Sequence, residues 1–185
     1  LDFKINSSLI RINENKKNVY IDISITEGNK YFIGDAKLSG KYENVPEALL
    51  QAQIVLRKGQ VFNRAEVTAT TNRLNQILGD YGYAFSNANA IPDVNKEERT
   101  VSFNFFVDPG NKIYVRRINF YGNEKTKDSV LRREMRQFEA SWYAKHKVDR
   151  SQTRLSATQY FDSIDIQTTS VPGTTDQIDV NVQVV

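Results

Sequence analysis

The chain contains no cysteine and only one histidine among its 185 residues. The lack of cysteine excludes disulfide bonds and cysteine-based zinc sites. The histidine, His146, stands between Lys145 and Lys147, and the sequence shows no carboxylate placed to orient it. Since catalysis needs a positioned nucleophile and base, we predict that His146 is a surface loop residue. We expect no enzymatic activity, no metal and no cofactor.

Long hydrophobic runs are also missing. The longest apolar runs cover a few residues, whereas a membrane helix needs ~20. Apolar residues make up 39% of the chain and charged residues 25%, which is typical of a folded, soluble protein. No basic segment followed by an apolar run opens the sequence. It starts inside a strand-like pattern, LDFKINSSLIRI, so we expect a part excised from a longer protein.

The net charge of +3 is small and unevenly spread. Residues 1–109 carry 13 basic and 13 acidic groups, and residues 110–185 carry 12 basic and 9 acidic groups, which indicates a local basic patch. Small α+β modules do bind RNA. However, the charge is weak for phosphate binding and no Gly-x-x-Gly clamp opens a helix, so an RNA-binding module is the remote alternative.

The sequence contains an internal repeat. The stretch ITEGNKYFIGDAKLSGK at 25–41 matches VDPGNKIYVRRINFYGN at 107–123 after a shift of 82 residues, which places Gly40 on Gly122. Alternating apolar residues precede both stretches and also close the chain, and such alternation predicts strands with one buried face. The recurrence predicts tandem copies of one small domain.

Within the first copy, apolar spacing predicts a helix around Val45–Ile54 that ends before Gly59. Asn63 is a candidate N-cap for a second helix, which stops at Gly79 and Gly82. Two strands, YAFSNANAIP and RTVSFNFFVDPG, follow and are joined by a polar turn.

The second copy repeats this order. A helix starts at Thr126 or Asp128 and is expected to direct Leu131, Met135 and Phe138 toward the core. Asp149 is expected to cap a second, shorter helix, and a hairpin turning at Pro172-Gly173 closes the chain.

Each copy is therefore predicted to be an α+β unit of order β-α-α-β-β. Its three-stranded mixed sheet is covered on one face by two helices, with the last strand central and the middle strand at an edge. The expected domains are residues 29–109 and 110–185, with residues 1–28 forming the final hairpin of a preceding copy.

Two surfaces are candidates for protein binding. The first lies on the first helix of the second copy, where an Arg-rich stripe beside the only tryptophan is typical of a binding hot spot. Its candidate partner-binding residues are Arg132, Arg133, Arg136, Glu139, Trp142 and Tyr143. The alternative is an ordinary solvated helix with an Arg136–Glu139 pair.

The second candidate surface is the edge strand of each copy, Tyr83–Ile91 and Phe161–Val171. Unpaired backbone groups at an edge can pair with an extended client of almost any sequence. The candidate client-binding residues are Tyr83, Phe85, Asn87, Phe161, Ile164 and Ile166. The alternative is a solvated edge, which the polar tracts SNANA and QTTS favour.

The stretches VRRINFYGN, KDSVLRREMRQFEASW and SVPGTTDQIDV resemble the last polypeptide-transport-associated (POTRA) domain of the outer-membrane β-barrel assembly factors. ITEGNKYFIG and LGDYGYAF resemble the domain before it, so the resemblance covers essentially the whole chain. It implies the fourth and fifth POTRA domains of such a factor, without the family's C-terminal membrane barrel.

The same resemblance implies a non-catalytic scaffold on the periplasmic face of a Gram-negative outer membrane. Its expected partners are a BamD-type lipoprotein, other lipoproteins of the assembly complex, the factor's own barrel and unfolded outer-membrane protein clients. A related secretion or translocation-assembly transporter remains the alternative within the superfamily.

Overall fold

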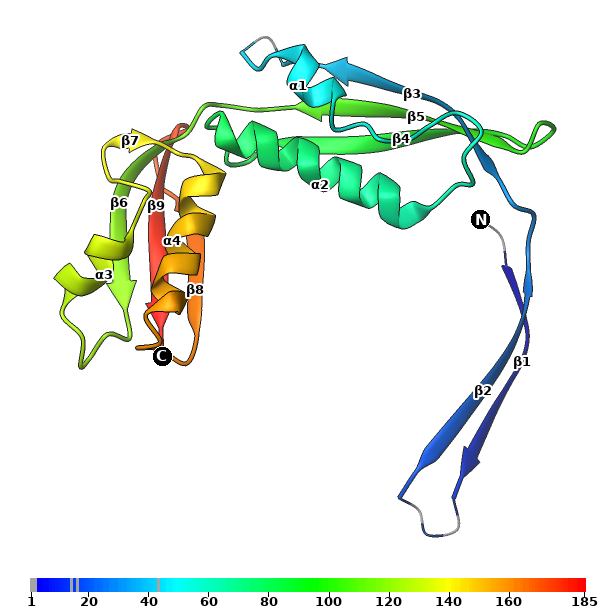
Figure 1. Cartoon of the computed structure of the whole chain (residues 1–185), viewed down its shortest axis with the longest axis horizontal. Coiled ribbons are helices and arrows are strands. Elements are labelled where there is room, and N and C mark those ends of the chain that lie inside the picture. The colour runs from blue at the N-terminus through cyan, green and yellow to red at the C-terminus, as the bar shows by residue number, and fades with distance from the viewer. Residues whose placement is uncertain (1–2, 14, 16, 43) are drawn as a thin grey trace.

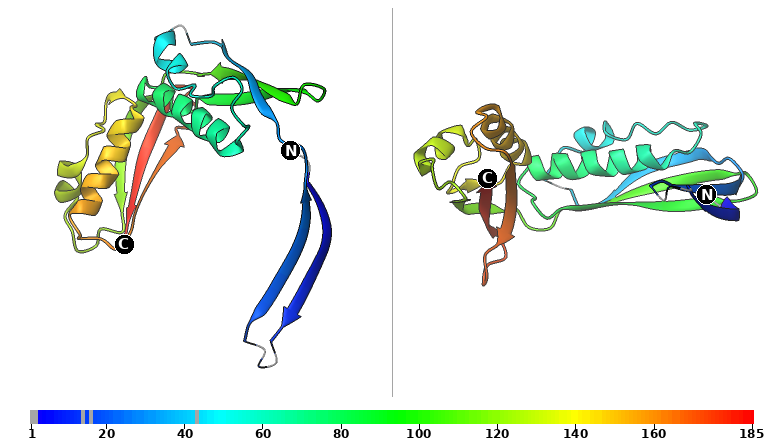
Figure 2. Two further views of the ribbon diagram at one scale, coloured as in Figure 1. Left: turned by 45° about the vertical axis from the view of Figure 1, so that its right-hand side comes forward. Right: turned by 90° about the horizontal axis from the view of Figure 1, so that it is seen from below.

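The computed structural model describes residues 3–13, 15, 17–42 and 44–185. It consists of a hairpin followed by two α+β units, in each of which the helices lie on one face of a sheet (Figure 1). The hairpin comprises β1 (Phe3–Ile12) and β2 (Val19–Glu27). In the left view of Figure 2 the hairpin extends away from both units, and its apolar residues Val19, Ile21 and Ile23 are 58–62% exposed.

The first unit, here called the first module, is built on a three-stranded sheet of order β3-β5-β4. Its elements in chain order are β3 (Phe32–Gly40), α1 (Glu47–Gln51), α2 (Arg64–Asp80), β4 (Asn87–Asn95) and β5 (Thr100–Asp108). β3 runs parallel to β5 and β4 antiparallel to it. Asn63 caps α2 by accepting a hydrogen bond from Ala65 N–H at 2.9 Å, as predicted.

The second unit, here called the second module, repeats this plan with the sheet order β7-β6-β9-β8. Its elements are β6 (Tyr114–Tyr121), α3 (Asp128–Glu134), β7 (Ser141–Trp142), α4 (Lys145–Ala157), β8 (Ile164–Ser170) and β9 (Gln177–Val184). The α+β class, the element order and the central last strand are confirmed. The short β7 is an addition that the repeat did not predict.

The alternating residues of the central strands form the two cores. Val101, Phe103, Phe105 and Val107 of β5 are at most 7% exposed, and the matching residues of β9 are fully buried. Each strand contributes its other residues to the opposite, more exposed face. The period-2 pattern therefore identified the buried faces of β5 and β9 correctly. It was wrong for β2, whose alternating apolar residues are exposed because no helix packs on the described hairpin.

The repeated glycines lie where the first strand of each module touches the last. Gly40 has φ +112 and Gly122 has φ +81, and a Cβ at either position would overlap a carbonyl oxygen, that of Val107 or Val184. Glycine is thus required at both positions by backbone conformation and by close approach.

Several predicted helix limits are wrong. α3 ends at Glu134, so Phe138 is not on its core face and is 60% exposed. The helix ends because Met135 is extended, with φ −65 and ψ 140, and because Arg136 N–H is taken by Ser151 Oγ at 2.8 Å. α1 is also shorter than expected, ending at Gln51.

The start of α4 is a further correction, because the helix begins at Lys145 and Asp149 lies inside it. The cap comes from the other module: Asp80 Oδ1 accepts a hydrogen bond from His146 N–H at 2.6 Å and lies 3.0 Å from His146 Nδ1. His146 is exposed, as predicted, but it lies in the first turn of a helix rather than in a loop. Ile113 N–H adds a second link by donating to Gly82 C=O at 2.8 Å.

Candidate partner-binding surface

The loop between α3 and α4 is organised by Gln137, whose side chain is fully buried. Its Oε1 accepts a hydrogen bond from Ala144 N–H at 2.9 Å. Its Nε2 donates to Ser141 Oγ at 2.9 Å and to Trp142 C=O at 3.1 Å. Sequence reasoning missed this residue because a single glutamine in a polar stretch carries no periodic signal.

Backbone hydrogen bonds fix the same loop to the sheet. Ala140 N–H donates to Val115 C=O and Tyr143 N–H to Ile113 C=O, both at 2.9 Å. Ala140 adopts φ 55, a left-handed conformation that non-glycine residues rarely take without support. The loop is therefore a preorganised platform rather than a loose connection.

Two large aromatic side chains project from this platform. Phe138 is 60% exposed and Trp142 is 52% exposed. The Trp142 ring meets Tyr114 edge to face with centroids 5.8 Å apart, and Lys112 Nζ lies 4.9 Å from its centroid. These contacts hold the indole in place while half of it stays accessible, and rigid exposed aromatics are favoured anchors in interfaces.

Arg132 and Glu139 are held mainly by the second module itself. Glu139 Oε1 accepts from Ile118 N–H at 2.8 Å and from Arg132 Nη1 at 3.1 Å, and Arg132 Nη2 donates to Ile118 C=O at 3.0 Å. The Ile118 N–H, followed by the Arg132 guanidinium, lowers the pKa of Glu139. The pair thus covers the outer edge of β6, and the alternative Arg136–Glu139 pair is not formed among the described residues.

The remaining residues of the predicted stripe do not share one helical face. Arg133 is strongly exposed and lies 3.4 Å from the Glu134 carboxylate. Arg136 folds back, its Nη1 donating to Met135 C=O at 3.0 Å. Tyr143 is buried, and burial together with nearby Asp149 and Asp80 raises its pKa to about 12. The exposed aromatic residues of the α3–α4 loop are therefore Phe138 and Trp142, which we call the aromatic platform.

The predicted edge residues are partly displaced from the edges. β4 begins at Asn87, so Tyr83, which is 5% exposed, and Phe85, which lies in a turn, precede it. Phe161 likewise precedes β8, whereas Ile164 and Ile166 lie in β8 and pack partly against the core.

The outer edge of β4 is obstructed at two places. Ala88 N–H, which points away from β5, is capped by Asn75 Oδ1 at 2.9 Å. Pro92 lacks an N–H altogether, and proline is confined to edge positions where none is needed. Such blocks are typical of edges protected against unwanted pairing.

Within the part of the chain that the structure describes, no helix is long and apolar enough to span a membrane. The same residues contain no group of three His, Asp or Glu side chains placed to hold a metal ion. The molecule consists of a hairpin and two small α+β units, and the second unit carries the aromatic platform.

Residues 31–110 and 113–185 match the model of the POTRA family, described as a surface antigen variable number repeat. The chain therefore belongs to the POTRA family. It fits the POTRA region of the outer membrane protein assembly factor BamA. It is 36% identical over 180 residues to BamA of Neisseria meningitidis, a match covering 97% of this chain and 23% of the relative.

Two solved structures support this assignment. The crystal structure of Haemophilus influenzae BamA POTRA3-5 matches with a TM-score of 0.88 and 29% identity, covering 98% of this chain and 72% of that one. BamA from Haemophilus ducreyi lacking POTRA domains 1-3 matches with a TM-score of 0.73 and 36% identity, covering 83% of this chain and 29% of that one. The chain spans about a quarter of the length of the curated relatives it matches.

Proposed function

We propose that this chain is a non-catalytic periplasmic scaffold of the outer-membrane protein assembly machinery, and that its second module docks a BamD-type lipoprotein through the aromatic platform. The observation that carries this proposal is the exposure of Phe138 and Trp142, at 60% and 52%, on a loop fixed by buried Gln137. Aromatic and arginine side chains are enriched at binding hot spots. A preorganised loop also loses little conformational entropy on binding.

The platform also has suitable electrostatic surroundings. Lys112 lies over the Trp142 ring, and Arg133 in the last turn of α3 is strongly exposed. A partner that presents carboxylates around an apolar pocket would complement both features. Arg132 and Glu139 support this surface by holding the edge of β6, so we assign them a positioning role rather than direct contact.

The test is the affinity of the chain for the purified BamD-type lipoprotein, measured by calorimetry. We expect Trp142→Ala to weaken binding at least about tenfold, since hot-spot truncations cost about 2 kcal/mol or more. Tyr160→Ala is the matched control, because Tyr160 is an aromatic residue of the same module that is 64% exposed outside the platform. Equal affinities for both variants and the unmodified chain would contradict docking through the platform.

A second proposed function is the reception of unfolded outer-membrane protein strands by β-augmentation. The observation favouring it is that β3, β4 and β8 are all outermost strands of their sheets. We expect a strand-forming peptide to shift backbone amide resonances along one of these edges in an NMR titration. A titration that shifts no edge amide would contradict strand reception.

A further inference from the structure

The outer edge of β3 is built differently from the corresponding edge of β6. In the 82-residue repeat Ala36 corresponds to Ile118, and both lie in the first strand of their module. In the second module both backbone groups of Ile118 are occupied: Glu139 accepts its N–H and Arg132 donates to its C=O. The carboxylate and the guanidinium therefore close this edge.

The first module has a lysine where the second has the closing glutamate. Gly59 N–H donates to Ile33 C=O at 2.8 Å, just as Ala140 N–H donates to Val115 C=O at 2.9 Å. The residues preceding these two donors, Lys58 and Glu139, therefore occupy equivalent places. A lysine ammonium has only donors, so Lys58 cannot accept the strand's N–H as Glu139 does.

Backbone groups of β3 consequently remain available. Ile33 directs its N–H and C=O away from β5, because they bond to Gln60 C=O and Gly59 N–H. Ala36 and Leu38 direct their side chains toward the core, as Ile33 does. Strand residues whose side chains share a face also direct their N–H and C=O to the same side, so these groups of Ala36 and Leu38 point outward as well. Among the described residues, Ala36 N–H reaches only the adjacent Asp35 carboxylate, and Leu38 has no hydrogen-bond partner outside the sheet ladder.

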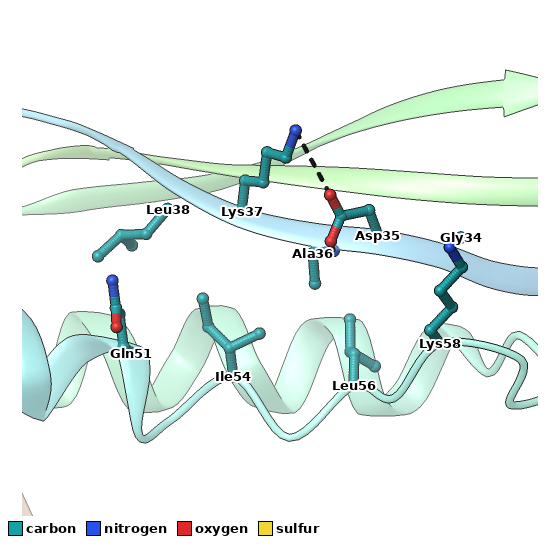
Figure 3. Close-up of a pocket in the computed structure, with 9 residues that line it drawn as sticks. All are labelled: Gly34, Asp35, Ala36, Lys37, Leu38, Gln51, Ile54, Leu56 and Lys58. Carbon is teal, nitrogen blue, oxygen red and sulfur yellow. Dashed lines mark hydrogen bonds and ion pairs between the residues drawn. The ribbon is translucent and has the colours of Figure 1, made fainter.

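A groove of about 510 Å³ runs along this open edge. Figure 3 shows Ala36 and Leu38 on β3 directed toward Ile54 and Leu56 of the segment between α1 and α2, with Lys58 at one end. The groove therefore combines a free strand edge, an apolar floor and an unpaired cation, since Lys58 forms no ion pair in the described part of the chain.

We propose that this groove receives an extended peptide strand that pairs with β3 at Ala36–Leu38 and carries a carboxylate next to Lys58. The proposal rests on the second proposed function, and it names the edge and the chemistry of the client. The chain's own backbone already uses the neighbouring part of the edge: Val61 bridges Phe32 antiparallel. A guest strand would continue this pairing beyond the point where the chain turns away at Gly59.

The shape and charge of the groove select this occupant. A strand rises about 3.3 Å per residue, so the open stretch 34–38 accommodates about five residues of a guest. Alternate side chains of the guest would lie over Ile54 and Leu56, which favours apolar residues at every second position. Lys58 adds a preference for an acidic residue, while Lys37 is already beside Asp35, at 3.4 Å.

The experiment uses the full 185-residue chain, isotope-labelled, and a nine-residue peptide of alternating valine and threonine in which two threonines are replaced by glutamate. We expect the peptide to shift the amide resonances of Ala36–Leu38 and Ile54–Lys58. Lys58→Glu supplies the missing acceptor and reverses the charge, so it should weaken binding about tenfold. Lys96→Glu is the control, because this substitution makes the same charge change in the exposed turn between β4 and β5.

A second peptide separates charge from pairing. With lysine in place of both glutamates, the peptide should bind the unmodified chain more weakly. Lys58→Glu should then weaken its binding by less than tenfold relative to the control, because the charge repulsion is gone and only the added acceptor remains.

The outcomes are distinct. Shifts confined to β4 or β8 would overturn this assignment while supporting strand reception. Equal weakening by Lys58→Glu and Lys96→Glu would also overturn it. The absence of binding to any edge would overturn both this inference and strand reception, and would leave docking of the lipoprotein at Trp142 to its own measurement.

Discussion

At the scale of single residues, the side chain of Gln137 fixes the loop between α3 and α4 in the second module. Its amide serves three backbone groups of the α3–α4 loop, Ala144 N–H, Phe138 C=O and Trp142 C=O, from a fully buried position. A buried amide with all its partners satisfied specifies one loop conformation, and removing it leaves those groups without partners. The exposure of the aromatic platform thus depends on a residue that is itself fully buried.

We expect Gln137→Leu to lower the free energy of unfolding by about 2 kcal/mol, because Ala144 N–H would be left buried without an acceptor. Urea denaturation followed by circular dichroism measures this loss. Gln152→Leu is the control: its side chain is exposed and donates one hydrogen bond to Ile164 C=O at 3.1 Å, so its loss should stay under about 1 kcal/mol. A smaller effect for Gln137 than for Gln152 would show that the loop does not depend on this amide.

Glu139 makes the stability of the second module depend on pH. Its folded-state pKa is lowered below the ordinary 4.5, first by Ile118 N–H and then by Arg132. Ionised Glu139 therefore stabilises the fold above that ordinary value, and this contribution is lost as the pH falls through the folded-state pKa. Stability falls in acid because the ionised carboxylate is the form that accepts the hydrogen bond from Ile118 N–H.

We expect Glu139→Gln to be less stable than the unmodified chain at pH 7, and the gap to narrow steadily below the ordinary pKa of 4.5. Urea unfolding at a series of pH values measures both curves. Glu124→Gln, at an exposed position without an ion pair among the described residues, should run parallel to the unmodified chain throughout. A gap for Glu139→Gln that is constant with pH would contradict the proposed role of its charge.

At the scale of elements, the glycine that ends the first strand of each module shows what the repeat encodes. Gly122 and Gly173 have the same φ of +81, but a Cβ at Gly122 would overlap the backbone of Val184, whereas nothing lies within 4 Å of one at Gly173. Comparing alanine at these two positions separates the cost of the backbone conformation from the cost of the strand contact.

We expect Gly173→Ala to destabilise the second module by about 1 kcal/mol, the cost of a left-handed conformation with a side chain. Gly122→Ala should cost about 3 kcal/mol, since β6 must also move away from β9. The midpoints and slopes of urea unfolding give both values. Similar losses at the two positions would mean that the strand contact at Gly122 relaxes freely.

The same elements show how far the sequence predicts this molecule. The buried faces of β5 and β9 and the cap of α2 at Asn63 could be predicted, because they depend on residues that are neighbours along the chain. The end of α3 could not, since it depends on Ser151 taking the N–H of Arg136 at 2.8 Å. Likewise the start of α4 depends on Asp80, which lies 66 positions from His146.

The candidate sites follow the same division. Trp142 could be singled out by its residue type. The exposure of Phe138 could not be predicted, because the sequence placed Phe138 on the core face of a helix. The open edge of β3 was missed because both outer strands of a three-stranded sheet are edges, and the choice between them depends on Asn75, Pro92 and Lys58, which lie far apart in the sequence.

At the scale of the whole molecule, the two modules are joined by more than their linker. Asp80, at the end of α2, caps the first turn of α4 through His146 N–H, and Gly82 C=O accepts from Ile113 N–H. A Cβ at Gly79 would lie 2.9 Å from Lys145 Cβ, so the helices approach closely there. The groove along β3 and the aromatic platform should therefore keep a fixed relative orientation. Under the proposed functions, a bound client strand and a bound lipoprotein would then be held at a fixed distance and angle.

The cap at Asp80 provides the test of this rigidity. Because the chain has no cysteine, Lys96→Cys and Lys125→Cys introduce one exposed spin-label site in each module. We expect a narrow distance distribution between the labels by pulsed electron paramagnetic resonance, and Asp80→Ala should broaden it. Loss of the cap should also lower the stability of the second module by about 1 kcal/mol, because His146 N–H in the first turn of α4 loses its acceptor.

The control is Asp93→Ala, which removes an exposed carboxylate of β4 that has no hydrogen bond or ion pair with the second module among the described residues. It should leave the distance distribution unchanged, since the orientation of the modules depends on where the carboxylate lies and not on net charge. If Asp80→Ala and Asp93→Ala give equally narrow distributions, the orientation depends on Gly82, Ile113 and the close helix approach at Gly79 alone. If the unmodified chain is already broad, the modules move independently, and the groove and the platform act as separate binding sites.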